Sequence, residues 1–361
     1  MIKILSLTYE GSKSGGPYSV SVNQKEVLDK NFFYLKLSYL KINIIYQYFF
    51  NKNNLKKFIN KFDLIHIHNF FSIKSILILK ISQSLAIPSV LSLHGNLNLW
   101  SMSNKPIRKF FFIHIFKNII NSTNLIHFLN KNEKDESSGL IGLNKIPNFI
   151  MPNCIDVSKY KITRNNNPLF TVLFFGRFDD KKNYLMIPDI VNLFKENNMN
   201  NVKFIIVGPK TKKNFDLLKS KIKELHLENF IEIRNPIYSF EEKNNLFEEV
   251  DVFILPSKDE GDSVAIKEAL ASGKPVIISK ECKLHYNEVN NMFIKIIEEH
   301  SILNYYKELV WYYDHPEEIK PLREKAQFYA RNNFSNNLIK KKLPTIYLDC
   351  INHLCEYKNY N

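Results

Sequence analysis

Eight short apolar runs, separated by segments of helical periodicity, decide what this chain can fold into. The runs span residues 2–7, 64–67, 89–93, 125–129, 172–175, 204–207, 252–255 and 276–278. Segments with apolar residues at helical spacing lie between them, at residues 72–85, 184–194, 215–225 and 241–247. Short apolar runs are typical of buried parallel strands, and their alternation with helices predicts an α/β protein with doubly wound sheets.

Two domains follow from the number of strands and the length of the chain. Eight strands are too many for one small sheet, and 361 residues exceed the usual size of a single core. The polar stretch 156–168, which contains three consecutive asparagines, predicts the linker. We therefore expect an N-terminal domain over residues 1–158 and a C-terminal domain over 168–332. The helical pattern beyond Asp314 predicts a helical tail, 333–361.

The composition limits the partners and the compartment. Lysine and arginine number 50 against 36 acidic residues, and the net charge of +14 favours a diphosphate, a nucleic acid or an acidic membrane surface. No Cys-x-x-Cys pair occurs among the four cysteines, so neither a zinc site nor a disulfide framework is expected. The N-terminus is typical of a strand rather than a signal peptide, and no apolar stretch has the ~20 residues of a membrane span. We expect a cytoplasmic protein.

Ligands bind doubly wound sheets where strands end and helices begin, so the loops at these junctions are the candidates for chemistry. The first such loop contains Gly15, Gly16 and Pro17. It lacks the Gly-Lys-Ser/Thr of a P-loop, and the chain has no Gly-x-Gly-x-x-Gly. Two interpretations stay open: a glycine turn whose amides approach a phosphate or sugar, and an ordinary turn with Pro17 at the first helical position.

The second junction places His94 and Gly95 after a predicted strand. An imidazole there could hydrogen-bond a sugar hydroxyl or share its proton, although a lone histidine is more often structural. His66 and His68 alternate on another strand and share a face, which could ligate a metal. No carboxylate lies near enough in sequence to complete a metal site, so packing is the expected role of this pair.

The third junction, residues 174–183, ends a strand in glycine and carries Arg177 and Lys182. These two cations could converge on one point beyond the strand end, as a diphosphate leaving group requires. The alternative is a pair of surface cations in a lysine-rich chain.

The fourth junction, residues 259–270, follows a buried strand and opens a helix. Ser263 is a candidate N-cap, so the amides of Ser263 and Val264 would point at an anion. Glu260 in the loop and Glu268 in the helix would then accept hydrogen bonds from sugar or ribose hydroxyls. The alternative is that both are ordinary charges of an amphipathic helix.

Taken together, these junctions resemble the retaining glycosyltransferases of family 4. Glu260 and Glu268 resemble the Glu-x7-Glu signature of that family, and residues 269–276 resemble its Ala-x-Ala-x-Gly-x-Pro-Val continuation. Further resemblances are Gly176-Arg177-Phe178 with Lys182, His94-Gly95, and Pro152-Asn153-Cys154-Ile155-Asp156 at the linker. The resemblance covers about residues 1–340 and implies the GT-B fold, two Rossmann-like doubly wound domains that face a central cleft. It also implies that the tail, 333–361, packs back on the first domain.

The resemblance also implies roles for individual residues. The donor-binding set would be Gly15, Gly16, Arg177, Lys182, Gly261, Asp262, Ser263, Val264 and Glu268. Within it, Arg177 and Lys182 would hold the diphosphate and Glu268 the ribose. His94 and Glu260 would be the catalytic residues at the reaction centre. Three departures from the family pattern stand out: Cys154 and Asn183 replace glycines, and Asp262-Ser263 replace Phe-Gly, where an acid could read a hydroxyl or point to water.

The function that the resemblance implies is transfer of a sugar, with retention of configuration, from a UDP- or GDP-sugar to an acceptor hydroxyl in cell-surface polysaccharide or lipopolysaccharide assembly. Asp-x-Asp, the metal-binding signature of the other major glycosyltransferase fold, occurs nowhere in the chain. We therefore expect catalysis without a metal or other cofactor. Two alternatives remain. A nucleotide-sugar epimerase of the same fold would rearrange the donor without an acceptor. A nucleic-acid-binding protein would account for the charge but not for Glu260 and Glu268 beside two cations.

The aromatic and basic stretches 32–48 and 108–117 suggest peripheral contact with an anionic bilayer that carries a lipid-linked acceptor. In the alternative interpretation, the apolar side chains of the second stretch face the core while Lys109 and Lys117 face solvent. The apolar side chains concerned are Phe110, Phe111, Ile113 and Phe116.

Overall fold

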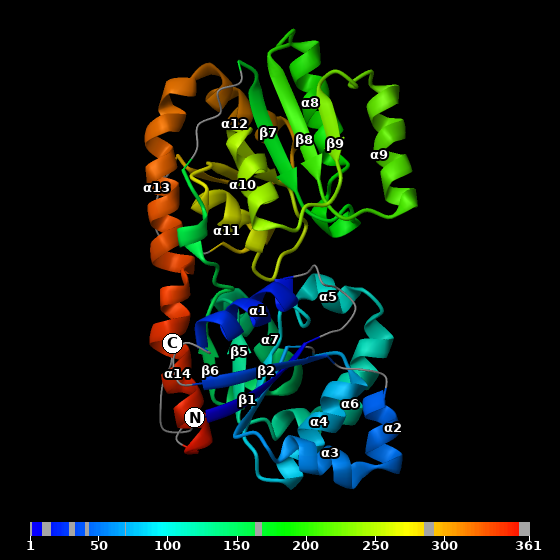
Figure 1. The fold of residues 1–361 in the computed structure, drawn as a ribbon. Helices are drawn as coiled ribbons and strands as arrows, with labels where there is room; N and C mark the ends of the chain where they lie inside the picture. The colour runs from blue at the N-terminus through cyan, green and yellow to red at the C-terminus, as the bar shows by residue number, and fades with distance from the viewer. Residues whose placement is uncertain are drawn as a thin grey trace. The chain divides into compact units, whose positions relative to one another are not determined.

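The computed structural model describes residues 2–8, 16–28, 33–39, 43–68, 70–162, 168–284 and 292–353. The chain forms two compact units, one of residues 1–155 with 335–361 and one of residues 156–334. Each unit is built on a six-stranded parallel sheet with helices on its faces (Figure 1). The predicted α/β class is therefore confirmed.

The first unit has the strand order β2-β1-β3-β4-β5-β6. Its strands are β1 (Ile2–Thr8), β2 (Phe33–Tyr39), β3 (Leu64–Ile67), β4 (Ser89–Ser92), β5 (Leu125–Phe128) and β6 (Asn148–Ile150). Its helices are α1 (Gly16–Leu28), α2 (Asn43–Phe50), α3 (Lys52–Ile59), α4 (Ile73–Ser84), α5 (Leu99–Ser103), α6 (Pro106–Asn121), α7 (Lys131–Ile141) and α14 (Asn336–Ile351), with a short 3-10 turn at Leu143–Lys145.

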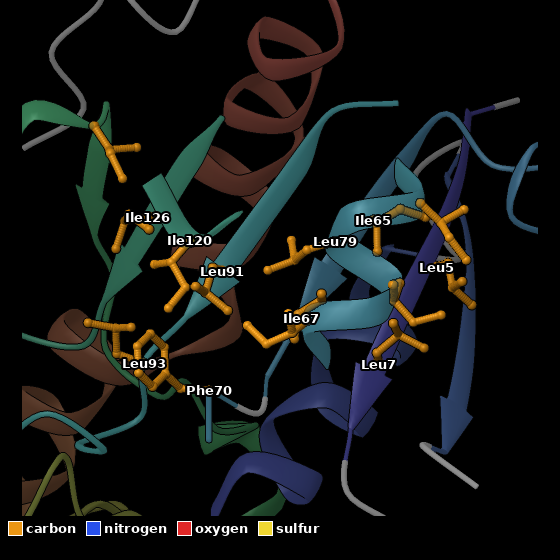
Figure 2. Close-up of a cluster of buried hydrophobic side chains, with 14 of the residues drawn as sticks. Leu5, Leu7, Ile65, Ile67, Phe70, Leu79, Leu91, Leu93, Ile120 and Ile126 are labelled. Carbon is orange, nitrogen blue, oxygen red and sulfur yellow. The ribbon is translucent and has the colours of Figure 1, made fainter. Parts of the chain in front are cut away.

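Alternate residues of these strands enter different cores, because successive side chains of a strand point to opposite faces. On one face Leu5, Ile65 and Leu91 pack against α4 and α6, as Figure 2 shows for Leu79 and Ile120. The other face carries Ile4, Leu64 and Val90, which pack with side chains of α1 and α14. The C-terminal helix α14 is thus part of the first unit's core.

The second unit has the strand order β12-β11-β10-β7-β8-β9. Its strands are β7 (Phe170–Phe175), β8 (Val202–Val207), β9 (Ile231–Arg234), β10 (Val252–Leu255), β11 (Val276–Ser279) and β12 (Ile294–Ile297). Its helices are α8 (Met186–Glu196), α9 (Lys212–Glu224), α10 (Phe240–Glu248), α11 (Val264–Ala271), α12 (Ile302–Asp314) and α13 (Pro316–Phe334), with 3-10 turns η2 (Val157–Lys159), η3 (Asp180–Lys182) and η4 (Lys280–Cys282).

Eight of these strands were predicted from the sequence, and β2, β6, β9 and β12 were not. Residues 163–167 of the expected linker and residues 354–361 of the expected helical tail lie outside the described residues. Among the residues that the structure describes, no helix has the length and apolarity needed to cross a bilayer.

Candidate functional site

The strand order of the second unit reverses between β7 and β10, which pair directly. Chain connections leave such a switch point in opposite directions, and ligands of doubly wound sheets bind there, beyond the carboxyl ends of the strands. The third and fourth sequence junctions follow these two strands, so the fold brings Gly176–Asn183 and Asp259–Ser263 to one edge of the sheet. A hydrogen bond of 2.8 Å from the Lys258 amide to the Lys181 carbonyl joins the two loops.

The loop after β7 is shaped by Asp179. Its side chain accepts a hydrogen bond of 3.0 Å from the Lys182 amide and so caps the turn η3. Asn183 ends this turn in the left-handed conformation, with φ of 52°. Asparagine and glycine are the residues that tolerate this conformation best, which explains why asparagine can replace the glycine of the family pattern here. Cys154, the other replacement, has no such φ and lies buried in the first unit.

The cations of this loop have separate partners. Lys182 lies 2.5 Å from Glu260, and the side chains of the two are only 13% and 9% exposed. The Ser257 hydroxyl donates a second hydrogen bond of 2.6 Å to the same carboxylate oxygen. Arg177 is 66% exposed, and its Nε lies 3.6 Å from Asp179. The guanidinium therefore stands in solvent, whereas Lys182 lies in a mostly buried ion pair.

Asp259 anchors the second loop. It forms ion pairs with Lys181 at 2.8 Å and with Lys283 at 2.9 Å. Burial opposes ionisation of this carboxyl, but the two lysines outweigh it and lower its pKa. Asp259 was not among the predicted site residues, although it directly precedes the Glu260 of the signature.

Asp262 and Ser263 lie at the start of α11. Ser263 occupies the N-cap position, but within the described chain its side chain makes no capping hydrogen bond. Asp262 forms an ion pair with Lys267, which is fully buried. The idea that Asp262 points to water is therefore wrong. Its carboxylate pairs with a lysine inside the second unit. Val264 is the first residue of α11.

Glu268 lies in α11 and is buried. One of its oxygens accepts hydrogen bonds of 3.0 Å from the Tyr160 hydroxyl and 2.7 Å from Lys243. Burial, and then the nearby Glu268 carboxylate, raise the pKa of the Tyr160 hydroxyl far above its ordinary value, so the hydroxyl stays a donor. The Lys243 ammonium also lies 5.8 Å from the ring of Phe175, the last residue of β7. Ordinary charges of an amphipathic helix would be solvated. Glu260 and Glu268 are both buried, so neither is a charge of that kind.

In the first unit, the glycine loop is only partly described. Gly15 lies outside the described residues, and Gly16 is the first residue of α1. Pro17 therefore lies in the first helical turn, where its missing amide proton costs nothing.

His94 follows β4 and adopts an unusual backbone conformation. Its φ of 50° and the φ of 72° at Gly95 place two consecutive residues in the left-handed region. The His94 Nε2 lies 2.9 Å from Nδ1 of His68, the residue that follows β3. Burial, with His68 and His127 nearby, holds the pKa of His94 well below its ordinary value. The two imidazoles are therefore neutral, and one of them donates the shared proton.

A buried carboxylate holds this turn. Glu133 of α7 accepts hydrogen bonds from the amides of Gly95 and Leu129, the second at 2.6 Å, and its side chain is fully buried. Its own amide donates to the side chain of Asn130, the N-cap of α7. Glu133 was not among the predicted site residues, but Asn-x-x-Glu after the strand 125–129 resembles a helix-start signature and could have indicated it.

His66 and His127 belong to a buried hydrogen-bond chain whose direction can be deduced. His127 Nε2 donates to the Met151 carbonyl at 2.7 Å, and burial lowers the pKa of His127 to about 4. Its neutral Nδ1 must then accept from Ser92, at 2.7 Å. The Ser92 oxygen accepts from His66, at 2.7 Å, and His66 accepts from the Tyr347 hydroxyl, at 2.6 Å. The expected packing role of His66 fits this chain, which ties α14 to the sheet.

Within the described residues, the second unit brings together Lys182 with Glu260 and Glu268 with Lys243 at the ends of β7 and β10. His94 lies in the first unit. No group of three or more histidine, cysteine, aspartate or glutamate side chains in the described part of the chain is arranged to hold a metal ion.

Solved structures of this architecture are similar over nearly the whole chain. HepE from Anabaena, in complex with UDP and glucose, is 17% identical, with a TM-score of 0.76 over 96% of this chain and 99% of its own. Sucrose-phosphate synthase from Thermosynechococcus elongatus is 12% identical, with a TM-score of 0.79 over 98% and 100%. A glycosyltransferase from Rickettsia africae is 16% identical, with a TM-score of 0.77 over 97% and 98%. Identities this low establish the fold alone.

Family models match both halves of the sequence. Residues 158–331 match the model described as Glycosyl transferases group 1, and residues 24–159 match the model described as Glycosyltransferase Family 4. No curated protein sequence gives a significant match. The two models favour a transferase over the nucleotide-sugar epimerase. The chain is a glycosyltransferase of family 4 with the GT-B fold.

Proposed function

We propose that this glycosyltransferase moves a sugar from a nucleoside diphosphate sugar to an acceptor hydroxyl, with retention of configuration. The observation that carries the proposal is the pairing of Lys182 with Glu260 at the switch point, in a loop that also carries the exposed guanidinium of Arg177. A departing nucleoside diphosphate builds up negative charge, and preformed cations stabilise that charge best. Carboxylates beside those cations suit hydroxyl groups rather than phosphate.

In the donor complex, the diphosphate takes the place of Glu260 as the partner of Lys182, and Arg177 closes on it from the solvent side. Glu260 is then released to accept hydrogen bonds from the transferred sugar, next to Gly261 and the amides of Ser263 and Val264. Glu268 exchanges one of its present donors, the Lys243 ammonium or the Tyr160 hydroxyl, for the ribose hydroxyls. His94 of the first unit is the second catalytic residue of the proposal.

The cations Arg177 and Lys182 supply the positive charge that a divalent ion would otherwise supply, so the proposed reaction needs no metal and no other cofactor. A UDP-sugar is the preferred donor. Support comes from structures of similar fold: HepE is described in complex with UDP-glucose, and the pneumococcal O-GlcNAc transferase GtfA in complex with UDP and GlcNAc. An acceptor in cell-surface polysaccharide or lipopolysaccharide assembly, reached by peripheral contact with the membrane, completes the proposal.

The experiment that tests this function is a thermal-shift screen with UDP, GDP and their sugars, followed by product analysis. A ligand that binds only the folded protein raises its unfolding temperature with concentration. We expect a UDP-sugar to raise it and to be converted to UDP and a glycosylated acceptor. Release of an epimerised sugar nucleotide without an acceptor would instead establish the epimerase, and the absence of a shift with every nucleotide would refute donor binding.

A further inference from the structure

Helix α6 is apolar on two sides. Ile113 and Ile120 are buried in the core of the first unit, and Phe112 and Phe116 pack against that core. Apolar residues on the other side of the helix have no such cover. The exposed fractions are 72% for Ile107, 65% for Phe110, 57% for Phe111 and 65% for Ile115. The alternative interpretation that Phe110 and Phe111 face the core is therefore wrong.

These four residues form a continuous stripe. Their spacing of three, four and eight residues places them on one face of a helix over more than two turns. A surface helix normally keeps its solvent face polar, and contiguous exposed apolar residues mark an interaction site. We call Ile107, Phe110, Phe111 and Ile115 the α6 stripe.

Helix α2 adds a second apolar point on the same side of the sheet. Phe49 and Phe50 are 69% and 76% exposed. Helix α4 packs against both α2 and α6, so the three helices belong to one layer (Figure 1).

The charge of this layer selects its partner. Residues 43–121, which contain α2 to α6, carry ten lysines and arginines and one acidic residue, Asp63. Lys105 and Arg108 are exposed at the start of α6, and Lys117 is exposed nearer its end. Two copies of such a surface would repel each other. An anionic bilayer has negative headgroups that attract these cations and an apolar interior that can bury the exposed apolar side chains.

We propose that the α6 stripe, flanked by Arg108 and Lys117, docks this enzyme on an anionic lipid bilayer. It deepens the proposed function, on which it rests for the idea of a membrane-bound acceptor, by naming the surface that reaches the lipid. The aromatic side chains enter the interface between headgroups and acyl chains, and the cations hold the anionic headgroups.

The test is co-sedimentation of the full chain with vesicles of phosphatidylcholine alone or mixed with phosphatidylglycerol. We expect binding only to the mixed vesicles, weakened by salt. The double variant Phe110→Ser/Phe111→Ser should bind about tenfold more weakly. Arg108→Gln/Lys117→Gln should lose a similar factor, because each juxtamembrane cation contributes to attraction by an anionic surface. The matched control is Phe328→Ser, an equally exposed phenylalanine of α13 in the second unit.

Three results would overturn the docking surface: no binding of the parent to anionic vesicles, equal binding of the Phe110→Ser/Phe111→Ser variant, or a dimer of the parent that this variant dissociates without any effect on vesicles. Thermal shifts by UDP-sugars, measured on the same proteins, separate this failure from failure of the proposed function. The docking variants should retain the shift of the parent, since Arg177, Lys182 and Glu268 lie in the second unit.

Discussion

Lys182 and Glu260 are 78 residues apart in the sequence, and their side chains form an ion pair of 2.5 Å at the point where the second sheet reverses its strand order. Because both groups are mostly buried, each compensates the charge of the other in a place with little solvent. The donor site that we propose is built around this pair.

Replacing Lys182 with methionine should both destabilise the protein and abolish donor binding. The change leaves the Glu260 carboxylate buried without its cation, which costs about 3 kcal/mol of unfolding free energy. Chemical denaturation measures that loss. Adding Glu260→Gln should restore most of the stability, since the uncompensated charge is gone, but not the thermal shift by UDP. A double variant that regains UDP binding would show that Lys182 has only a structural role.

Glu268→Gln should weaken UDP binding about tenfold, because an amide replaces the carboxylate that, in the proposed complex, accepts hydrogen bonds from the ribose hydroxyls. Titration calorimetry of UDP binding to the parent and to the variant measures the effect. The control is Glu298→Gln, a substitution at an exposed position of the same unit. Comparison with deoxy-UDP identifies the contact. The parent should bind deoxy-UDP more weakly than UDP, and the variant should bind the two compounds almost equally. An equal loss in both proteins would place the ribose elsewhere.

Gly208→Ala should destabilise the second unit. A Cβ at Gly208 would lie 1.9 Å from the backbone oxygen of Gly176, so the loops after β7 and β8 would have to separate. Overpacking against backbone costs about 2 kcal/mol. The matched control is Gly139→Ala in α7, where an added Cβ meets nothing within 4 Å and should stabilise the helix by up to about 1 kcal/mol. Thermal unfolding of the two variants should therefore move in opposite directions.

Acidification should destabilise the first unit through its buried histidines. Burial holds the pKa of His127 at about 4, and those of His66, His68 and His94 well below the ordinary value. An unfolded histidine gains a proton near pH 6.5, whereas these do not, so the unfolded state binds more protons and stability decreases as the pH is lowered. The loss should be about 1 kcal/mol per histidine between about pH 7 and about pH 5.5. His127→Gln should flatten this dependence, and denaturation curves at several pH values test it.

His68 should position His94 for the reaction. His68→Leu removes the hydrogen bond to His94 Nε2 and should lower kcat about tenfold, with little change in the KM for the donor. His68→Asn, whose amide can reach the position of Nδ1, should recover much of the lost activity. A parallel fall of kcat in both variants, or a rise in KM alone, would argue against this role.

The sequence predicted the central strands well because they are buried on both faces and read as continuous apolar runs. β9 and β12 were missed since they lie at the sheet edges, where charges such as Glu232 and Lys295 interrupt the pattern. β6 has only three residues, and β2 belongs to a stretch so aromatic that strand and helix could not be told apart.

The site was predictable only in part, for a physical reason. Local motifs located the loops after β7 and β10, and the structure brings those loops together at the switch point. Side-chain partners far apart in the sequence left no local signal: Lys243 and Tyr160 bind Glu268, and Glu133 holds the turn at His94. Such contacts depend on tertiary packing, which spacing alone does not encode.

The most direct test of the donor site is titration calorimetry of the UDP-sugar that gives the largest thermal shift, on the parent and on Arg177→Met. Arg177 is 66% exposed, so its replacement should leave the unfolding temperature unchanged while weakening binding about tenfold through loss of the diphosphate contact. Equal affinity of the two proteins would contradict a diphosphate site at the ends of β7 and β10.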